Sequence, residues 1–130
     1  MIGYLFLLNP LVMTKIKKTN LEWKCELSPQ EFHITREGGT EAPFTNQFYD
    51  HSETGVYHCV CCGHDLFISD NKYNSGTGWP SYNQPINDNV LTEVKDLSLG
   101  TVRTEVKCSH CDAHLGHLFP DESKKTGKRY

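Results

Sequence analysis

The sequence has no excess of basic residues, no repeat of fixed period and no tract of low complexity. Its 13 lysine and arginine residues are outnumbered by 16 acidic residues, which gives a formal net charge of −3. A protein that holds nucleic acid by its phosphates needs a positively charged surface, so the composition argues against that class of function. A length of 130 residues leaves room for one domain with a modest hydrophobic core.

A long apolar run is also missing. Residues 1–13 form the most apolar stretch, but they are too short to span a bilayer and are interrupted by Asn9 and Pro10. No positive charge precedes the run, as it would in an export signal. We therefore interpret residues 1–13 as a non-native or disordered extension, and expect Met13 to be the natural start of the chain.

Helix signals are confined to the N-terminal part of the chain. The stretches Thr19–Glu22 and Ser28–Glu31 each match a capping box, and Gly38 is placed to end the second predicted helix. Residues 74–89 are rich in glycine, proline and asparagine, which predicts a loop. Alternation of apolar and polar residues predicts strands at residues 56–60, 65–68, 90–94 and 100–107. The pattern is typical of a mainly β domain with short N-terminal helices.

Four of the six cysteines form two Cys-x-x-Cys pairs, Cys59 with Cys62 and Cys108 with Cys111. A turn with this spacing brings two sulfurs together, and two such turns complete the tetrahedral shell of a structural Zn²⁺. With four thiolates the ion has no open position for catalysis. Its role would be to join turns that are 45 residues apart, which restricts the unfolded chain.

Two alternatives to this four-cysteine shell stay open at the level of the sequence. The four cysteines could form two disulfides or remain free thiols, or one of three nearby histidines (His110, His114 or His117) could replace a cysteine. Cys61 is left outside the shell, because an adjacent pair holds a metal less well than the x-x spacing. Thiolate ligands favour a reducing compartment, so we expect a cytoplasmic protein.

Three blocks of sequence carry a family resemblance: SGTGWPSY at residues 75–82, RTEVKCSHCDAHLGHLFPD at 103–121 and TGKRY at 126–130. They resemble the signature blocks of the B-type methionine sulfoxide reductases, which reduce the R epimer of methionine sulfoxide. The resemblance covers residues 27–130, which we interpret as the reductase domain, preceded by an N-terminal segment at 14–26. It implies two small antiparallel sheets that carry the active site on one face, with the zinc at the far end.

The resemblance also implies roles for individual residues. Trp79 matches the tryptophan whose ring receives the methyl group of the substrate, and a flat apolar ring suits that contact. His114 and His117 match the paired histidines of the substrate pocket, and Asp121 matches the carboxylate beside them. Arg129 matches the arginine that precedes the nucleophile. Without the family, each of these residues would be interpreted as a packing, turn or solvated side chain.

The nucleophile that the family pattern places directly after Arg-Tyr is missing, because the sequence ends at Tyr130. We therefore interpret the sequence as a truncated form that lacks the C-terminal strand, and expect the 130-residue chain to be inactive. Many relatives carry a resolving cysteine in the glycine-rich loop, where this sequence has Thr77. Cys25 is then the candidate for that role, and direct reduction of the enzyme by thioredoxin is the alternative.

The first functional hypothesis is the thiol-dependent reduction of methionine-R-sulfoxide, in proteins and as the free amino acid, by a monomer that thioredoxin regenerates. A zinc-stabilised, non-catalytic module that binds sulfoxide or a protein partner is the competing hypothesis. A binding measurement with dimethyl sulfoxide would distinguish a sulfoxide-binding module from a module that binds only protein.

Overall fold

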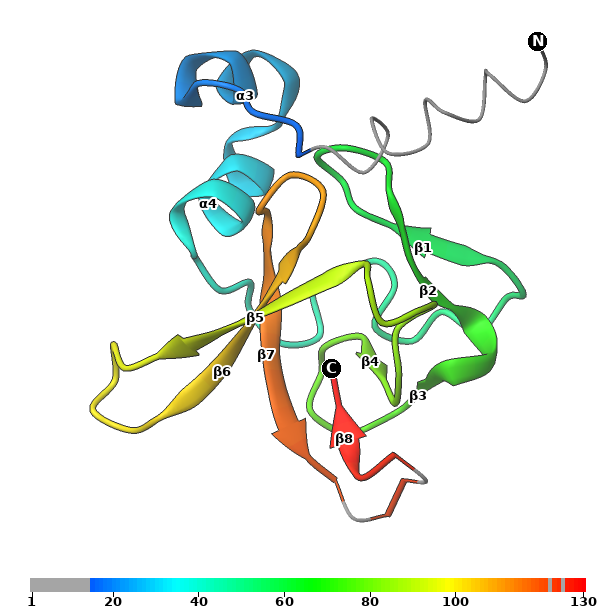
Figure 1. Ribbon diagram of the computed structural model, residues 1–130. Helices are drawn as coiled ribbons and strands as arrows, with labels where there is room; N and C mark the ends of the chain where they lie inside the picture. Colours follow the sequence, from blue (N-terminus) through cyan, green and yellow to red (C-terminus); the bar gives the residue numbers. More distant parts are fainter. Residues whose placement is uncertain (1–14, 122, 125) are drawn as a thin grey trace, which may run out of the picture.

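Figure 1 shows the computed structural model of the protein, which describes residues 15–121, 123–124 and 126–130. The predicted extension at residues 1–13 lies outside the described residues. In the part of the chain that is described, no helix has both the length and the apolar character needed to cross a membrane.

Two short helices, α3 (Asn20–Glu26) and α4 (Pro29–Glu37), open the described chain. The side chains of Thr19 and Ser28 each accept a hydrogen bond from the backbone N–H three residues later, and both capping boxes are complete. Gly38 ends α4 with a φ of 71°, a conformation that glycine adopts without a steric penalty. Both helices predicted from the capping signals are confirmed.

Every strand pairing in the structure is antiparallel. The strands group into two two-stranded sheets and one four-stranded sheet with the order β5-β6-β7-β8. A short 3-10 turn, Ser69–Asn71, lies between β2 and β3. The strands are β1 (Val56–His58), β2 (Asp65–Ile68), β3 (Lys72–Tyr73), β4 (Ser81–Tyr82), β5 (Leu91–Asp96), β6 (Arg103–Cys108), β7 (His114–Pro120) and β8 (Lys128–Arg129). The mainly β class with antiparallel sheets and short helices is confirmed.

The sequence did not predict four of the strands, β3, β4, β7 and β8, of which β7 and β4 are the most informative. Strand β7 does not alternate simply between apolar and polar residues. Its pairing with β6 shifts register between Val106 and Lys107, so a simple alternation does not describe which side chains face the core. Strand β4 lies inside the stretch 74–89 that was predicted to be a loop, and its two residues are held by pairing with β3. Both strands depend on partners that a local pattern does not reveal.

The core lies between the helices, the cysteine turns and the inner strands. Trp23 on α3 is 2% exposed, and its ring packs under the guanidinium of Arg36, 4.6 Å from the ring centre. Phe67 and Tyr82 stack with ring centres 4.1 Å apart. Such burial of large side chains contributes about 1.5–3 kcal/mol per residue. The other buried apolar members of the core cluster are Phe32, Leu66, Val90 and Ala113.

Candidate active site and metal centre

The four cysteines of the two Cys-x-x-Cys turns meet in the structure. Their sulfur atoms all lie within 4.8 Å of one another, and the sulfurs of Cys59 and Cys111, and of Cys62 and Cys108, are 3.7 Å apart. Four sulfurs around a tetrahedral Zn²⁺, each about 2.3 Å from the ion, are ~3.8 Å from one another. A disulfide needs a separation of about 2.05 Å, so the geometry fits a metal shell and excludes two disulfides.

Cys61 and the nearby histidines do not belong to this group of four. Cys61 is half-buried, and the cluster contains no histidine among the described residues. The imidazoles of His64 and His110 instead stack on each other, with ring centres 4.8 Å apart. The structure therefore favours the all-cysteine shell over the alternatives in which a histidine replaces a cysteine.

The crowded sulfurs lie within hydrogen-bond distance of one another. Hydrogen bonds from Cys111 and Cys59 hold the pKa of Cys108 well below its ordinary value, since they stabilise the thiolate. The pKa of Cys59 is raised, first by its hydrogen bond to Cys108 and then by that to Cys111. A cation in place of the protons would stabilise the four thiolates, so the donor set fits Zn²⁺.

A β-bulge brings His114 and His117 to the same face of the four-stranded sheet. Residues three apart on a regular strand point to opposite faces, but Val106 pairs with Gly116 and the next residue, Lys107, pairs with His114. The extra residue on β7 therefore brings the side chains of His114 and His117 to the same face of the sheet. Their imidazole rings lie 5.5 Å apart.

Each histidine is held by a carboxylate from another strand of the same sheet. Nδ1 of His114 lies 2.7 Å from Oε2 of Glu105 on β6, and Nε2 of His117 lies 2.7 Å from Oδ2 of Asp96 at the end of β5. Arg103 also donates to Asp96, at 3.1 Å. These side chains are between 10% and 29% exposed, so their hydrogen bonds are only partly accessible to water.

Strand β8 adds Arg129 to the same face. Phe119 pairs with Arg129 in register, and the guanidinium lies 4.8 Å from the centre of the Phe119 ring. The ring of His117 is 6.5 Å from that of Phe119, so the histidines and the arginine form a continuous row. Beyond β8, the backbone of Tyr130 exchanges two hydrogen bonds with Tyr82 of β4, of 2.8 and 3.1 Å.

Trp79 lies in the loop before β4, with 37% of its surface exposed. Its indole N–H donates to the backbone oxygen of Glu41 at 2.9 Å, which fixes the ring against the connector that follows α4. Gly78, with a φ of 89°, packs so closely on Pro43 and Phe44 that a Cβ would approach both within 3.0 Å. Among the described residues, Trp79 makes no hydrogen bond or ring contact with either histidine.

Asp121 follows β7 and is occupied by local hydrogen bonds. Its Oδ1 accepts from Ser123, and its Oδ2 accepts from the hydroxyl of Tyr73 at 2.8 Å. Hydrogen bonds from Ser123 first, and from Tyr73 second, hold the pKa of Asp121 below its ordinary value. Asp121 therefore ties the turn after β7 to β3, rather than contacting the histidines.

Cys25 is exposed on α3, and Figure 1 shows α3 and β8 at opposite ends of the molecule. Of the residues singled out from the sequence, the structure thus brings together His114, His117 and Arg129, and separately the four cysteines. Asp121 is tied to β3 through Tyr73, and Trp79 precedes β4, which pairs with β3. Cys25 does not join either group in this structure.

Sequence reasoning missed three side chains that complete this region: Asp96, Glu105 and Tyr73. Glu105 could have been found from the register, because a β6–β7 hairpin through the cysteine turn places it opposite His117. Asp96 and Tyr73 belong to segments that reach the site only through long-range pairing, and no local signal marks them.

Comparison with protein families matches residues 27–130 to the family described as SelR domain. Because that match takes in the described sheets and the cysteine cluster, the protein is a SelR-domain protein.

Three curated relatives bear the name "Peptide methionine sulfoxide reductase MsrB". The chain is 52% identical to the protein of Hahella chejuensis and 52% to that of Pseudomonas fluorescens, each over 91% of this chain and over 85% and 90% of the relative. It is 53% identical to the protein of Acinetobacter baylyi, over 91% of this chain and 85% of the relative. The chain belongs to the MsrB family of enzymes.

Proposed function

We propose that the protein reduces methionine-R-sulfoxide, in oxidised proteins and as the free amino acid, to methionine. The observation that carries this proposal is the row of two carboxylate-held histidines and Arg129 on one sheet face. Membership of the MsrB family supports it, because the relatives are named for the reduction of methionine sulfoxide in peptides.

The nucleophile in this proposal is a cysteine that directly follows Tyr130. Its thiolate attacks the sulfoxide sulfur, the oxygen is protonated and transferred to the cysteine sulfur, and methionine leaves. The products are methionine and a cysteine sulfenic acid. The backbone hydrogen bonds between Tyr130 and Tyr82 support this assignment, since they join Tyr130 to β4, the strand that follows the loop of Trp79.

The remaining residues of the proposed site take supporting roles. His114 and His117 are the proposed proton donors for the departing oxygen, and their carboxylate partners fix the two rings. The positive charge of Arg129 favours a thiolate at a neighbouring position. Trp79 offers the apolar ring for the methyl group of the substrate, and Asp121 fixes the turn that leads into β8.

The cysteine cluster is proposed to hold one structural Zn²⁺, bound by Cys59, Cys62, Cys108 and Cys111. When bound, the ion would join the turn after β1 to the turn between β6 and β7 without an open coordination position. Thioredoxin is the proposed reductant: its two thiols reduce the sulfenic acid to a thiol and release water, while thioredoxin becomes a disulfide. A monomer in the cytoplasm fits this chemistry, with Cys25 as an alternative first partner of the sulfenic acid.

A matched pair of extended chains tests the proposal. One carries a cysteine and a short tail after Tyr130, and the other carries serine at the same place. Turnover of the R epimer with thioredoxin should be at least ~10³-fold faster for the cysteine chain, and the S epimer should not react. Equal rates for the pair would overturn the proposal. Binding of dimethyl sulfoxide without turnover in the cysteine chain would instead support the non-catalytic binding module.

A further inference from the structure

Arg103 is a charged side chain beside the row of histidines to which the proposed function gives no role. It is the first residue of β6, and its side chain is 29% exposed. Its Nη2 donates to Oδ2 of Asp96 at 3.1 Å. Its Nε is buried and has no hydrogen-bond partner among the described residues. The guanidinium is therefore held by its contact with Asp96.

The carboxylate of Asp96 receives three hydrogen bonds. Its Oδ1 accepts from the backbone N–H of Ser98 at 2.9 Å, and its Oδ2 accepts from Arg103 and from Nε2 of His117, which is 2.7 Å away. Hydrogen bonds from Ser98 first, and from His117, hold the pKa of Asp96 well below its ordinary value, so the carboxylate is ionised at neutral pH. An ionised carboxylate can only accept, so the proton of the bond to His117 belongs to Nε2.

The ring of His117 depends on Asp96 for its orientation. Glu105 pairs with His117 in register, but its Oε2 lies 2.7 Å from Nδ1 of His114 instead. In the part of the chain that the structure describes, Asp96 is the only carboxylate within hydrogen-bond distance of His117. A displacement of Asp96 would therefore release the ring.

Little else holds Asp96 in place. Strand β5 is an edge strand, and the pair of Asp96 with Arg103 is the last of the β5–β6 ladder before the turn. Three apolar side chains beyond this pair, those of Leu97, Leu99 and Val102, are between 64% and 69% exposed, so packing does not fix the end of the hairpin. A hairpin end without packing opens readily. A cross-strand pair of opposite charges opposes this opening.

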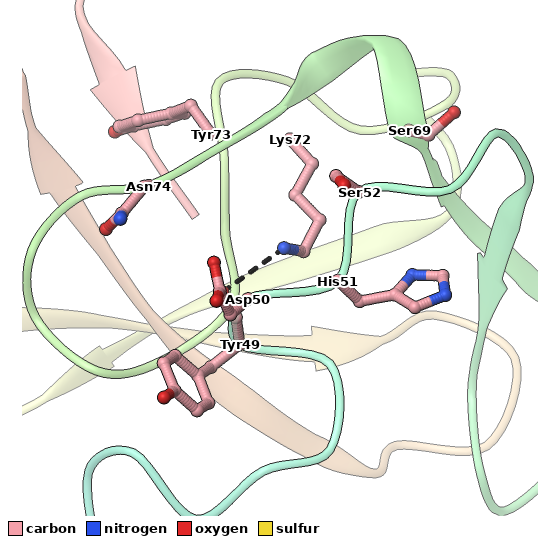
Figure 2. Close-up of a pocket in the computed structure, with 8 residues that line it drawn as sticks. All are labelled: Tyr49, Asp50, His51, Ser52, Ser69, Lys72, Tyr73 and Asn74. Atoms are coloured by element: carbon pink, nitrogen blue, oxygen red, sulfur yellow. Dashed lines mark hydrogen bonds between the residues drawn. The ribbon is translucent and has the colours of Figure 1, made fainter.

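Lys72, another partly buried cation, has no such link to the two histidines. Figure 2 shows it beside Asp50, and its Nζ donates to the backbone oxygen of Tyr49 at 3.3 Å. The residues that line the cavity around it come from β3, the turn before β3 and the connector that follows α4, and none belongs to β5, β6 or β7. Arg103 is thus the cation whose partner also binds a histidine of the proposed site.

We propose that Arg103 is a positioning residue for the reduction of the sulfoxide. It holds Asp96 at the last pair of the hairpin, and Asp96 in turn holds His117 by Nε2, which leaves Nδ1 as the nitrogen that exchanges a proton with the substrate. The catalytic part of this role rests on the proposed function. The hold of Arg103 on Asp96 and His117 does not.

The exchange of the Nε2 proton of His117 with water tests this hold in the 130-residue protein, without any turnover. In Arg103→Met the proton should exchange at least roughly tenfold faster, because the end of the hairpin opens and the hydrogen bond to a charged group is lost more often. Arg103→Lys should keep slow exchange, since one ammonium can make the single contact with Asp96. Lys95→Met removes an exposed cation next to Asp96 and is the matched control that should change nothing.

Arg103→Gln, which keeps a polar side chain, is the second neutral variant and should behave as Arg103→Met does. Exchange that is unchanged in both neutral variants would refute the hold. Fast exchange of the His117 proton in the parent protein would refute it as well.

Turnover by the cysteine-extended chain tests the catalytic part. Arg103→Met should lower kcat by roughly tenfold and change KM by about twofold at most, because His117 acts in the chemical step and not in binding. Arg103→Lys should recover most of the lost kcat. An effect on KM alone would show that Arg103 does not act through His117.

A double-mutant cycle separates positioning from a general effect on stability. If Arg103 acts through Asp96, adding Arg103→Met to Asp96→Asn should lower kcat no further. Losses of kcat that multiply in the double variant would reject the proposed route through Asp96.

Failure of this proposal can be told from failure of the proposed function. Absence of sulfoxide turnover in the cysteine-extended parent would reject the proposed function, while proton exchange would still decide whether Arg103 holds His117. Normal turnover with a kcat that does not respond to Arg103→Met would reject the role of Arg103 alone.

Discussion

Nδ1 of His114 lies 2.7 Å from Oε2 of Glu105, and the two side chains are only 10% and 20% exposed. An ionised carboxylate can only accept, so the proton of this hydrogen bond belongs to Nδ1. The other ring nitrogen, Nε2, is then the one that can exchange a proton with a substrate. The carboxylate therefore fixes both the orientation and the tautomer of the imidazole.

Glu105→Gln should loosen this arrangement, because an amide can present either a donor or an acceptor to Nδ1. In the cysteine-extended chain we expect kcat to fall by roughly 10- to 100-fold with little change in stability. The nitrogen chemical shifts of His114 should also show a mixture of tautomers. Glu93→Gln makes the same substitution at an exposed position of β5 and should leave both readouts unchanged. Loss of activity with a single, unaltered tautomer would contradict the positioning role.

Asp96 should make stability sensitive to acid. Hydrogen bonds from Ser98 first, and from His117, hold the pKa of Asp96 well below its ordinary value. A carboxylate with a lowered pKa in the folded state stabilises the protein above its unfolded pKa of about 3.9, and that contribution is lost as the pH falls from there. The free energy of unfolding should therefore decline more steeply below about pH 4 in the parent protein than in Asp96→Asn.

Denaturant unfolding at several pH values measures this difference. Asp65→Asn removes an exposed carboxylate from β2 and controls for the change in net charge. An Asp96→Asn variant whose stability follows the parent curve through the acid range would show that the hydrogen bonds of Asp96 do not stabilise the fold.

Metal analysis should find about one zinc ion per chain, in line with a single four-sulfur site. Cys111→Ser, or exhaustive chelation, should remove the metal and lower Tm by roughly 10 °C or more, as expected for a loss of ~3 kcal/mol. Cys61→Ser and Cys25→Ser lie outside the cluster and should retain the metal. Full zinc content in Cys111→Ser would show that the four sulfurs are not the ligands.

Gly116→Ala should strain the bulge that aligns the two histidines. Gly116 has a φ of 155°, which side chains rarely adopt, although a Cβ would meet no atom within 4 Å. The cost is then conformational, and we expect a loss of about 1–3 kcal/mol in the free energy of unfolding. Gly55→Ala, at a site that is equally open and lacks such a φ, should cost less. Equal losses for the two variants would contradict the strain.

The parts of the fold that the sequence predicted are those encoded by local contacts. A capping box is formed by residues three apart, so Thr19 and Ser28 mark both helices without any knowledge of the rest of the chain. The Cys-x-x-Cys turns are local in the same sense. The pairing of the two turns followed from the chemistry of a four-ligand metal shell.

The parts that escaped prediction depend on contacts between distant residues. Strands β3, β4 and β8 have two residues each, too few to show alternation, and exist because of their partners. The bulge in β7 changes the face of His114 in a way that strict alternation cannot anticipate. Asp96 reaches His117 from another strand, 21 residues earlier in the chain.

Strand β5 forms one edge of the four-stranded sheet. An edge strand can recruit further strands and so start the growth of amyloid. Glu93 and Lys95 are exposed on β5 on either side of Val94. In a fibril of identical chains stacked in register, each of these charges would lie against its own copy at intervals of about 4.8 Å, which opposes stacking. The strand that supplies Asp96 to the proposed active site thus carries its own protection against aggregation.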